Sequence, residues 1–207
     1  EMNTIDLPLE QIKTLPAIGG ENDIMKALQL MPGVQSGSEG NSGLYVRGGS
    51  PDQNLIIVDD VPLYNVNHIG GFVSVFNTDA LRSVKLIKGG APARYGGRLS
   101  SVLDIRMKEG NNQQYIVQGG IGLVSTRLSV EGPIGNNTSF ILSGRRFLLD
   151  LFTRPISRLS FEGVTLGYYF YDTNLKLNHT FSEKDKLFFS FYQGDDKILV
   201  KVKNKND

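Results

Sequence analysis

Residues 171–181 read YDTNLKLNHTF, and this stretch decides how the second half of the chain folds. Every second position carries an all-polar set: Asp172, Asn174, Lys176, Asn178 and Thr180. The positions between them are mostly apolar: Tyr171, Thr173, Leu175, Leu177, His179 and Phe181. Because successive side chains of a strand point to opposite faces, the pattern predicts a β-strand with one apolar and one polar face. Its eleven residues match the about 9–11 residues with which a barrel strand crosses a bilayer.

The same alternation continues on both sides of this stretch. Residues 124–131 and residues 187–191 alternate in the same way. Residues 135–138 and 182–185 are short polar turns, whereas residues 151–167 form a longer connection. Short turns that alternate with longer loops are typical of outer-membrane barrels. We therefore expect four or five antiparallel strands in residues 111–207.

A second interpretation of these strands stays open on the pattern alone. A soluble antiparallel sheet with one hydrated face has the same period of two. The chain would then include a soluble β-rich binding module, for example for carbohydrate. The run YYFY at residues 168–171 favours the membrane, since aromatic girdles lie at membrane interfaces, although sandwich cores are also rich in aromatic residues.

The first half of the chain has the signals of a small α+β domain. Ile24, Ala27, Leu28 and Met31 form one apolar stripe, which predicts a helix over residues 24–31. Asn22 or Asp23 can cap its start, and proline and glycine follow its end. We expect further strands at residues 44–47, 55–58, 83–88 and 100–107. The polar run at residues 108–112 predicts the boundary between a domain at 1–110 and a second at 111–207.

Composition excludes several classes of protein. The 22 Lys and Arg residues nearly balance 21 Asp and Glu residues, so we expect no nucleic-acid partner. Cysteine is absent and only His68 and His179 are present, so we expect no metal site and no cofactor. The adjacent Asp59 and Asp60 resemble a catalytic pair, but aspartates at the end of a strand are more typical of a turn. His68 has no evident nucleophile beside it, and we expect no enzyme.

Four segments, in order, resemble the plug domain of TonB-dependent outer-membrane receptors. They are residues 22–34, 44–49 (LYVRGG), 57–64 (IVDDVPLY) and 84–105 (VKLIKGGAPARYGGRLSSVLDI). The resemblance covers residues 12–108 and continues more loosely through residues 143–146 and the strands that follow. It is most similar to receptors of the Bacteroidetes.

The resemblance implies an α+β plug domain followed by the antiparallel strands of an incomplete transmembrane β-barrel. The whole receptor would be an active importer in the outer membrane of a Gram-negative bacterium, with a plug that occludes the lumen of a barrel of about 22 strands and faces the periplasm. The implied partners are TonB, the remaining barrel strands, outer-membrane lipid and an imported nutrient that the sequence does not identify. At most five strands are present, so we expect this chain to be a piece of a longer one. Residues 3–7 are a poor candidate for the segment that contacts TonB.

The resemblance also assigns roles to particular residues. Arg47, Arg94 and Arg98 match positions where plug arginines meet carboxylates of the barrel. Arg145 and Arg146 point to opposite faces of one strand, so only one of them can face the lumen, and we assign Arg145 to this plug–barrel contact. A third set is expected to shape turns of the plug: Gly48, Gly49, Asp59, Asp60, Gly89, Gly90, Gly96 and Gly97.

Overall fold

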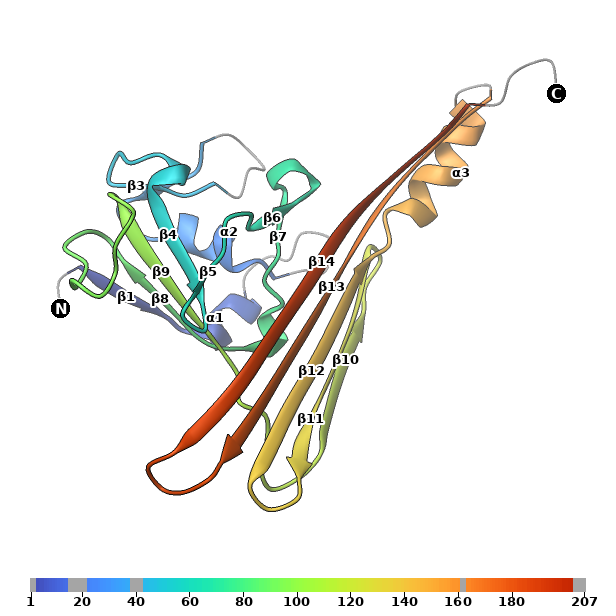
Figure 1. The fold of residues 1–207 in the computed structure, drawn as a ribbon. Coiled ribbons are helices and arrows are strands. Elements are labelled where there is room, and N and C mark those ends of the chain that lie inside the picture. The colour runs from blue at the N-terminus through green and yellow to red at the C-terminus, as the bar shows by residue number, and fades with distance from the viewer. Residues whose placement is uncertain (1–2, 15–21, 38–42, 161–162, 203–207) are drawn as a thin grey trace.

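Two β-sheets make up most of the chain in a computed structural model that describes residues 3–14, 22–37, 43–160 and 163–202. Figure 1 shows a compact N-terminal unit lying beside a long, curved and tilted sheet. The strand order is β1-β8-β9-β4-β5 in the N-terminal unit and β10-β11-β12-β13-β14 in the second sheet. The expected α+β domain followed by antiparallel strands is confirmed.

The N-terminal unit is a mixed sheet covered by short helices. Its main strands are β1 (Thr4–Leu7), β4 (Asn54–Val58), β5 (Val61–Pro62), β8 (Leu81–Ile87) and β9 (Ser101–Met107). The smaller elements are α1 (Leu9–Thr14), α2 (Ile24–Gln29), β2 (Val34–Gln35), β3 (Tyr45–Val46), η1 (Pro51–Gln53), β6 (Asn67–His68), η2 (Ile69–Gly71), β7 (Val73–Ser74) and η3 (Thr78–Ala80). Only β4 and β9 run parallel, and the other pairs of the main sheet are antiparallel.

Helix α2 and strands β8 and β9 supply the most buried part of the core of this unit. The Asp23 carboxylate accepts a hydrogen bond from the Met25 amide (2.8 Å) and so caps α2, as expected from the sequence. The helix ends at Gln29, two residues earlier than predicted, and Met31 packs against the core from outside it. The most buried side chains of the core include Ile24, Leu28, Leu86, Leu103 and Ile105.

The second sheet is a continuous antiparallel meander. Its elements are β10 (Ile116–Ile121), β11 (Ser125–Ile134), β12 (Thr138–Phe147), α3 (Asp150–Ser160), β13 (Val164–Thr180) and β14 (Lys186–Val202). Each strand pairs with the next, and within the described residues the sheet is open, with β10 and β14 as its edges. The predicted boundary at residues 108–112 lies in the connection between β9 and β10.

The structure extends the predictions for this half in two places. Strand β13 has 17 residues and begins at Val164, seven residues before the stretch that alternates cleanly. The connection after β12 contains helix α3, which the sequence analysis assigned to a loop. Pro155 lies inside this helix and lacks the amide hydrogen of a helix interior, so the sequence carries no clean helix signal there.

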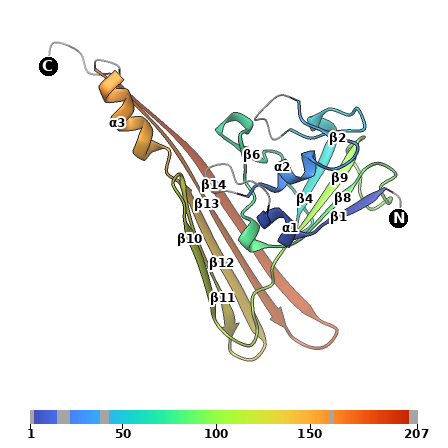
Figure 2. The same ribbon diagram turned by 180° about the vertical axis from the view of Figure 1, so that it is seen from behind.

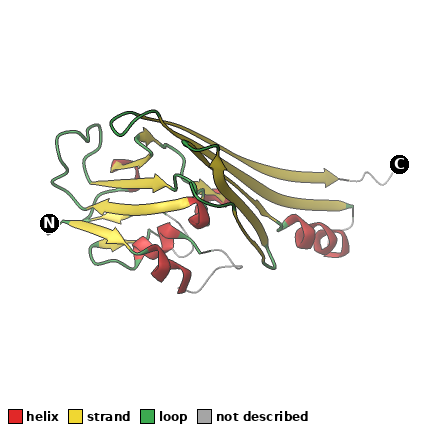
Figure 3. Ribbon diagram, turned by 90° about the horizontal axis from the view of Figure 1, so that it is seen from below, coloured by secondary structure: helices red, strands yellow, loops and turns green. Residues whose placement is uncertain are grey.

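The two faces of the second sheet differ sharply in polarity and surroundings. The even-numbered residues Asp172, Asn174 and Lys176 of β13 are buried against the N-terminal unit. The opposite face is apolar and exposed, with Leu187 61% and Phe189 54% exposed on β14. Figure 3 shows this sheet curving with the N-terminal unit on its concave side. Among the described residues, no helix has the length and apolar content needed to cross a bilayer.

Candidate functional site

The polar face of β13 meets the N-terminal unit in two clusters of buried charges, and these clusters form the candidate site. In the first cluster, Lys176 Nζ lies 2.9 Å from Asp59 Oδ1 and donates to the Met107 carbonyl oxygen (3.2 Å). Asp59 also accepts hydrogen bonds from the Ser190 hydroxyl (2.8 Å) and the Met107 amide (3.1 Å). Lys176 and Asp59 are 5% and 3% exposed, so this is a buried ion pair whose charges are shared with further hydrogen bonds.

Local backbone geometry explains why Asp59 can reach across to β13. Val58 pairs with Val61, so Asp59 and Asp60 are the two central residues of a tight hairpin. Both have positive φ (47° and 68°), as hairpin turns of this length prefer, and aspartate tolerates this conformation better than most residues. The turn points Asp59 into the interface.

The neighbouring Asp60 is directed away from the interface. It forms two hydrogen bonds with the Arg106 guanidinium (2.5 and 2.6 Å), and these bonds hold the pKa of the Asp60 carboxyl below its usual range. The two aspartates therefore have different partners, one in each unit. The described residues include no group of three or more histidine and carboxylate side chains placed to hold a metal ion.

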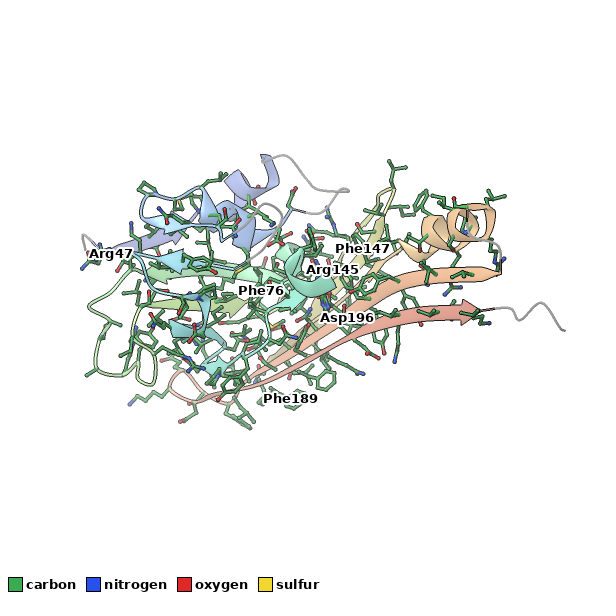
Figure 4. The ribbon with its side chains drawn as sticks, turned by 90° about the horizontal axis from the view of Figure 1, so that it is seen from above. Arg47, Phe76, Arg145, Phe147, Phe189 and Asp196 are labelled. Carbon is green, nitrogen blue, oxygen red and sulfur yellow. The ribbon has the colours of Figure 1, made fainter. Side chains whose placement is uncertain are left out.

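The second cluster is centred on Asp172 of β13. Arg145 of β12 donates to Asp172 Oδ2 from Nε (2.9 Å) and Nη2 (2.5 Å), and its Nη2 also donates to the Ser74 carbonyl oxygen (2.8 Å) in β7. The Tyr192 hydroxyl donates to Asp172 Oδ1 (2.8 Å). Arg145 thereby joins the second sheet to the backbone of the N-terminal unit. Figure 4 shows Arg145 and Asp196 where the two units meet.

His68 completes this second cluster from the N-terminal unit. Its Nε2 lies 2.7 Å from Asp172 Oδ1 and its Nδ1 lies 2.8 Å from Asp196 Oδ2. A ring with a carboxylate at each nitrogen is held best when both nitrogens carry protons. Burial alone disfavours the charged ring, but the hydrogen bonds and charges of Asp172 and Asp196 outweigh it and raise the pKa of His68.

Aromatic stacking fixes the orientation of the same ring. The imidazole of His68 is stacked on the Phe170 ring, with 4.1 Å between the centroids. The Phe147 ring is also stacked on Phe170, with 4.9 Å between the centroids. The Arg145 guanidinium lies 5.1 Å from the Phe170 centroid. A cation beside an aromatic face is favourable, so Phe170 supports both positive groups.

Further polar contacts extend the interface across β11 and along the sheet toward the short turns. Arg127 Nε of β11 lies 2.8 Å from Asp79 Oδ2 of η3. The Glu109 carbonyl oxygen accepts from the Ser139 hydroxyl (2.7 Å) and the Asn178 amide (2.5 Å). The contact between the two units therefore combines these charges and hydrogen bonds with an apolar cluster of Val73, Phe147 and Phe170.

Of the four arginines predicted for plug–barrel contact, Arg145 lies in this interface and the other three lie elsewhere. Arg47 donates to Asn3 Oδ1 (2.8 Å) within the N-terminal unit, at the end of it that is remote from Arg145 (Figure 4). Arg94 donates to the hydroxyl of its neighbour Tyr95 (2.9 Å), and Arg98 lines a surface hollow beside Leu55. For Arg47, Arg94 and Arg98, contact with carboxylates of strands beyond the described sheet stays a prediction.

The glycines expected to shape turns divide into three groups. Gly48, Gly89, Gly90 and Gly97 have positive φ, which favours glycine. Gly49 lies against the Ser100 side chain, where an added Cβ would collide with it. Gly96 has open space around it and no positive φ, so nothing in this structure requires glycine there.

Sequence reasoning missed most of the residues that join the two units. It placed Asp172 and Lys176 on the polar face without partners, and it gave His68, Asp196 and Ser190 no role. The available signal was the pair of opposite charges four residues apart on one face of a membrane-type strand. Charges in such a strand are favourable only where they face protein or water.

Comparisons with known proteins agree with this arrangement. Residues 10–102 match the family model described as TonB-dependent Receptor Plug Domain. The chain is 27% identical to the ferrienterobactin receptor of Escherichia coli over 152 residues, which are 59% of this chain and 20% of that receptor. It is 28% identical to the ferric enterobactin receptor of Pseudomonas aeruginosa over 153 residues, again 59% of this chain and 20% of that receptor.

Solved structures show the same fold across both units. The crystal structure of a mutant of the Pseudomonas aeruginosa ferric enterobactin receptor with enterobactin has a TM-score of 0.66 at 20% identity, and covers 96% of this chain and 34% of that chain. The siderophore receptor PirA of the same organism has a TM-score of 0.61 at 20% identity, and covers 94% of this chain and 34% of that chain. The chain spans about a fifth of the length of the curated relatives it matches.

An α+β unit held by buried charges against the polar face of membrane-type strands defines an outer-membrane receptor with a plugged barrel. Residues 10–102 are a TonB-dependent receptor plug domain, and the strands that follow have the fold of the barrel wall in TonB-dependent receptors of the Gram-negative outer membrane. The soluble β-rich module is not favoured. The resemblance to receptors of the Bacteroidetes stays a prediction. From here the N-terminal unit is called the plug and the second sheet the barrel sheet.

Proposed function

We propose that this chain is the gate of an active importer, in which the plug occludes the barrel lumen and moves when TonB supplies energy. The observation that carries the proposal is the buried pair of Asp59 on the plug and Lys176 on the barrel sheet. A plug held by a large apolar interface would be costly to displace, because each Å² of exposed apolar surface costs about 25 cal/mol. Charged and hydrogen-bonding groups can exchange their partners for water as the plug moves.

The proposal assigns TonB to a segment that precedes the plug sheet. Residues 4–7, which overlap the weak candidate for the TonB-contacting segment, form strand β1 and pair with β8. Pairing within the plug leaves only the outer edge of β1 for a partner. We therefore assign the contact with TonB to residues N-terminal to β1 in the complete receptor.

We also propose a ferric siderophore as the substrate class. Relatives from two species carry names that refer to ferric enterobactin, and a relative in Acinetobacter baumannii is named a probable siderophore receptor. Growth of a receptor-deletion strain that carries the complete receptor, under iron limitation with individual ferric siderophores, tests this assignment. No ferric siderophore restoring growth, with the receptor present at the cell surface, would contradict it.

No catalytic role is proposed for Asp59 or Asp60. Each carboxylate is engaged by a cation, Lys176 and Arg106 respectively. Asp59 also accepts hydrogen bonds from Ser190 and Met107, so its role is to hold the plug against the barrel sheet.

A reversible tether between plug and barrel sheet tests the gating role. Asp79→Cys and Arg127→Cys in the complete receptor replace an ion pair that joins the two units and has partly exposed side chains. A bismaleimide linker with an internal disulfide should abolish substrate uptake, and reduction of the linker should restore it. The two single-cysteine variants, treated in the same way, are the controls. Full uptake with the linker quantitatively in place would overturn the proposal.

A further inference from the structure

Helix α3 lies on the face of the barrel sheet that is turned away from the plug. Figure 2 shows α3 at one end of the sheet, with the plug on the other side of the strands. The contacts agree: Arg154 packs on Gly167, and Arg158 Nε donates to the Thr165 hydroxyl (3.4 Å). Gly167 and Thr165 are odd-numbered, so they lie on the same face of β13 as Tyr169 and Tyr171. Asp172 lies on the opposite face, which contacts the plug. The helix therefore sits on the outer surface of the barrel wall.

The polarity of α3 is inverted relative to a helix that packs on a protein core. The buried residues of α3 are polar, namely Asp150, which pairs with Arg146 of β12, and Ser157. Ser157 accepts a hydrogen bond from the Leu166 amide (2.9 Å). At about 100° per residue, Phe152, Ile156 and Leu159 fall together on the opposite side of the helix. They are 42%, 58% and 88% exposed, so the apolar side points away from the protein.

The position of α3 along the strand corresponds to the membrane surface. The 17 residues of β13, at about 3.3 Å each and tilted by about 40°, rise about 43 Å. The apolar band of a barrel is only about 25 Å tall. The exposed band starts near Leu187 and Phe189, at the short-turn end, so the rows around Thr165 and Tyr169 lie at or above its far edge. The helix is therefore at headgroup level on the side of the longer connections.

Basic side chains surround the helix on this same outer face. The described ones are Arg146, Arg154, Arg158, Lys197 and Lys201. Two carboxylates lie among them: Asp150 pairs with Arg146 and Arg154, and Asp195 pairs with Lys197 (2.6 Å). Five positive charges against two negative ones leave a net charge of +3 on these seven side chains. Such a surface complements phosphate groups.

We propose that α3 and the basic residues around it bind the outer leaflet of the membrane at its phosphorylated lipid headgroups. Phe152, Ile156 and Leu159 insert between the lipids, as an amphipathic interfacial helix does, and Arg158 and Lys201 contact the phosphates. The apolar side of α3 lies at the edge of the lipid-facing band of the strands and extends that band. Because the two apolar surfaces adjoin, we infer that lipid covers both. The proposal depends on the membrane location of the barrel sheet and is independent of gating or substrate.

A fluorescent label on the helix tests the insertion. Ile156→Cys in the complete receptor is labelled with an environment-sensitive dye and reconstituted in phosphatidylcholine vesicles that contain lipid A. The emission should shift to shorter wavelength, and lipids with headgroup-level nitroxides should quench it at least about twofold more than a label at Asp6→Cys, an exposed position on the plug. Equal access of aqueous iodide to the Ile156 label in vesicles and in detergent would overturn the proposal. So would protection that depends on receptor concentration, since a second copy would then cover the face.

Lipid binding in detergent tests the headgroup contact separately. The complete receptor is incubated with lipid A or with phosphatidylcholine, and bound lipid is counted by native mass spectrometry. Each of Arg158→Gln and Lys201→Gln should weaken lipid A binding about fivefold and leave phosphatidylcholine binding unchanged. Lys184→Gln, in the short turn at the other end of the sheet, is the matched control. Unchanged preference for lipid A in a variant that carries both Arg158→Gln and Lys201→Gln would overturn the headgroup contact.

Discussion

Lys176 of β13 and Asp59 of the β4–β5 turn are 117 residues apart in sequence and form a 2.9 Å ion pair that is almost fully buried. Both side chains are shielded from water, so neither charge is solvated where it lies. Removing one partner of a buried pair leaves the other as an uncompensated buried charge, which is costly. The pair therefore makes the seating of the plug sensitive to a single substitution on either side.

Replacement of Lys176 should loosen the plug without unfolding the barrel. We expect Lys176→Met in the complete receptor to destabilise plug seating by about 3–5 kcal/mol, because Asp59 then stays buried without a cation. Hydrogen exchange of residues 54–62 should rise strongly. Lys184→Met, in an exposed turn, should leave exchange unchanged. The double variant Asp59→Asn with Lys176→Met should recover part of the loss, and a double variant as loose as the single one would contradict this reasoning.

The charge on His68 should make the second cluster dependent on pH. Its pKa is raised in the folded protein because the hydrogen bonds and charges of Asp172 and Asp196 outweigh the cost of burial. A group with a higher pKa when folded adds stability that is fully present below about pH 6.5 and is lost as the pH rises through the raised value. Hydrogen exchange of residues 66–75, corrected for intrinsic rates, should therefore increase on going to alkaline pH.

The control for this pH dependence is the other histidine. His179 bonds the Thr138 hydroxyl (2.7 Å) and lies outside the interface, so His179→Gln should retain the effect. His68→Gln should remove it, giving exchange that no longer responds to pH in this range. A pH response of equal size in the His68→Gln variant would assign the effect to another group.

The period of two in the strands made the barrel sheet predictable, and its limits explain what was missed. Alternation identifies the faces of a strand but does not reveal which residues of another element lie opposite. Asp172 and Lys176 were therefore placed on the correct face, while their partners His68 and Asp59 were not identified. The 104 and 117 residues of separation are beyond any local pattern.

The plug was predictable because its turns and its helix carry local signals. Asp23 caps α2, and the Asp59–Asp60 turn follows a buried strand, so both features depend on neighbours in the chain. Helix α3 was missed for the opposite reason. Pro155 lies inside it and lacks the amide hydrogen of a helix interior, so the sequence carries no clean helix signal there.

Arg145 should be irreplaceable by lysine in holding Asp172. Two of its nitrogens bind one carboxylate and one of these also binds the Ser74 carbonyl, a planar geometry that an ammonium group does not reproduce. We expect Arg145→Lys to lose about 1.5–3 kcal/mol of plug seating. Increased protease cleavage of the plug in the folded receptor measures this. Arg146→Lys on the outer face is the control, and equal cleavage of the two variants would contradict the assignment.

Gly110 connects the plug to the barrel sheet and should tolerate no side chain. Its φ is +81°, and an added Cβ would collide with the backbone of Phe140 on β12. The left-handed conformation alone costs a non-glycine residue about 1–2 kcal/mol, and the backbone of a paired strand cannot yield as a flexible side chain can. Gly110→Ala should therefore lower the thermal unfolding temperature of the complete receptor. It should also lower the fraction of receptor whose plug resists protease. Gly96→Ala is the matched control, since open space surrounds that glycine and its φ is not positive, and it should change stability by less than about 0.5 kcal/mol. If both alanine variants unfold at the wild-type temperature, the close approach between the connection and β12 is absent from the folded receptor.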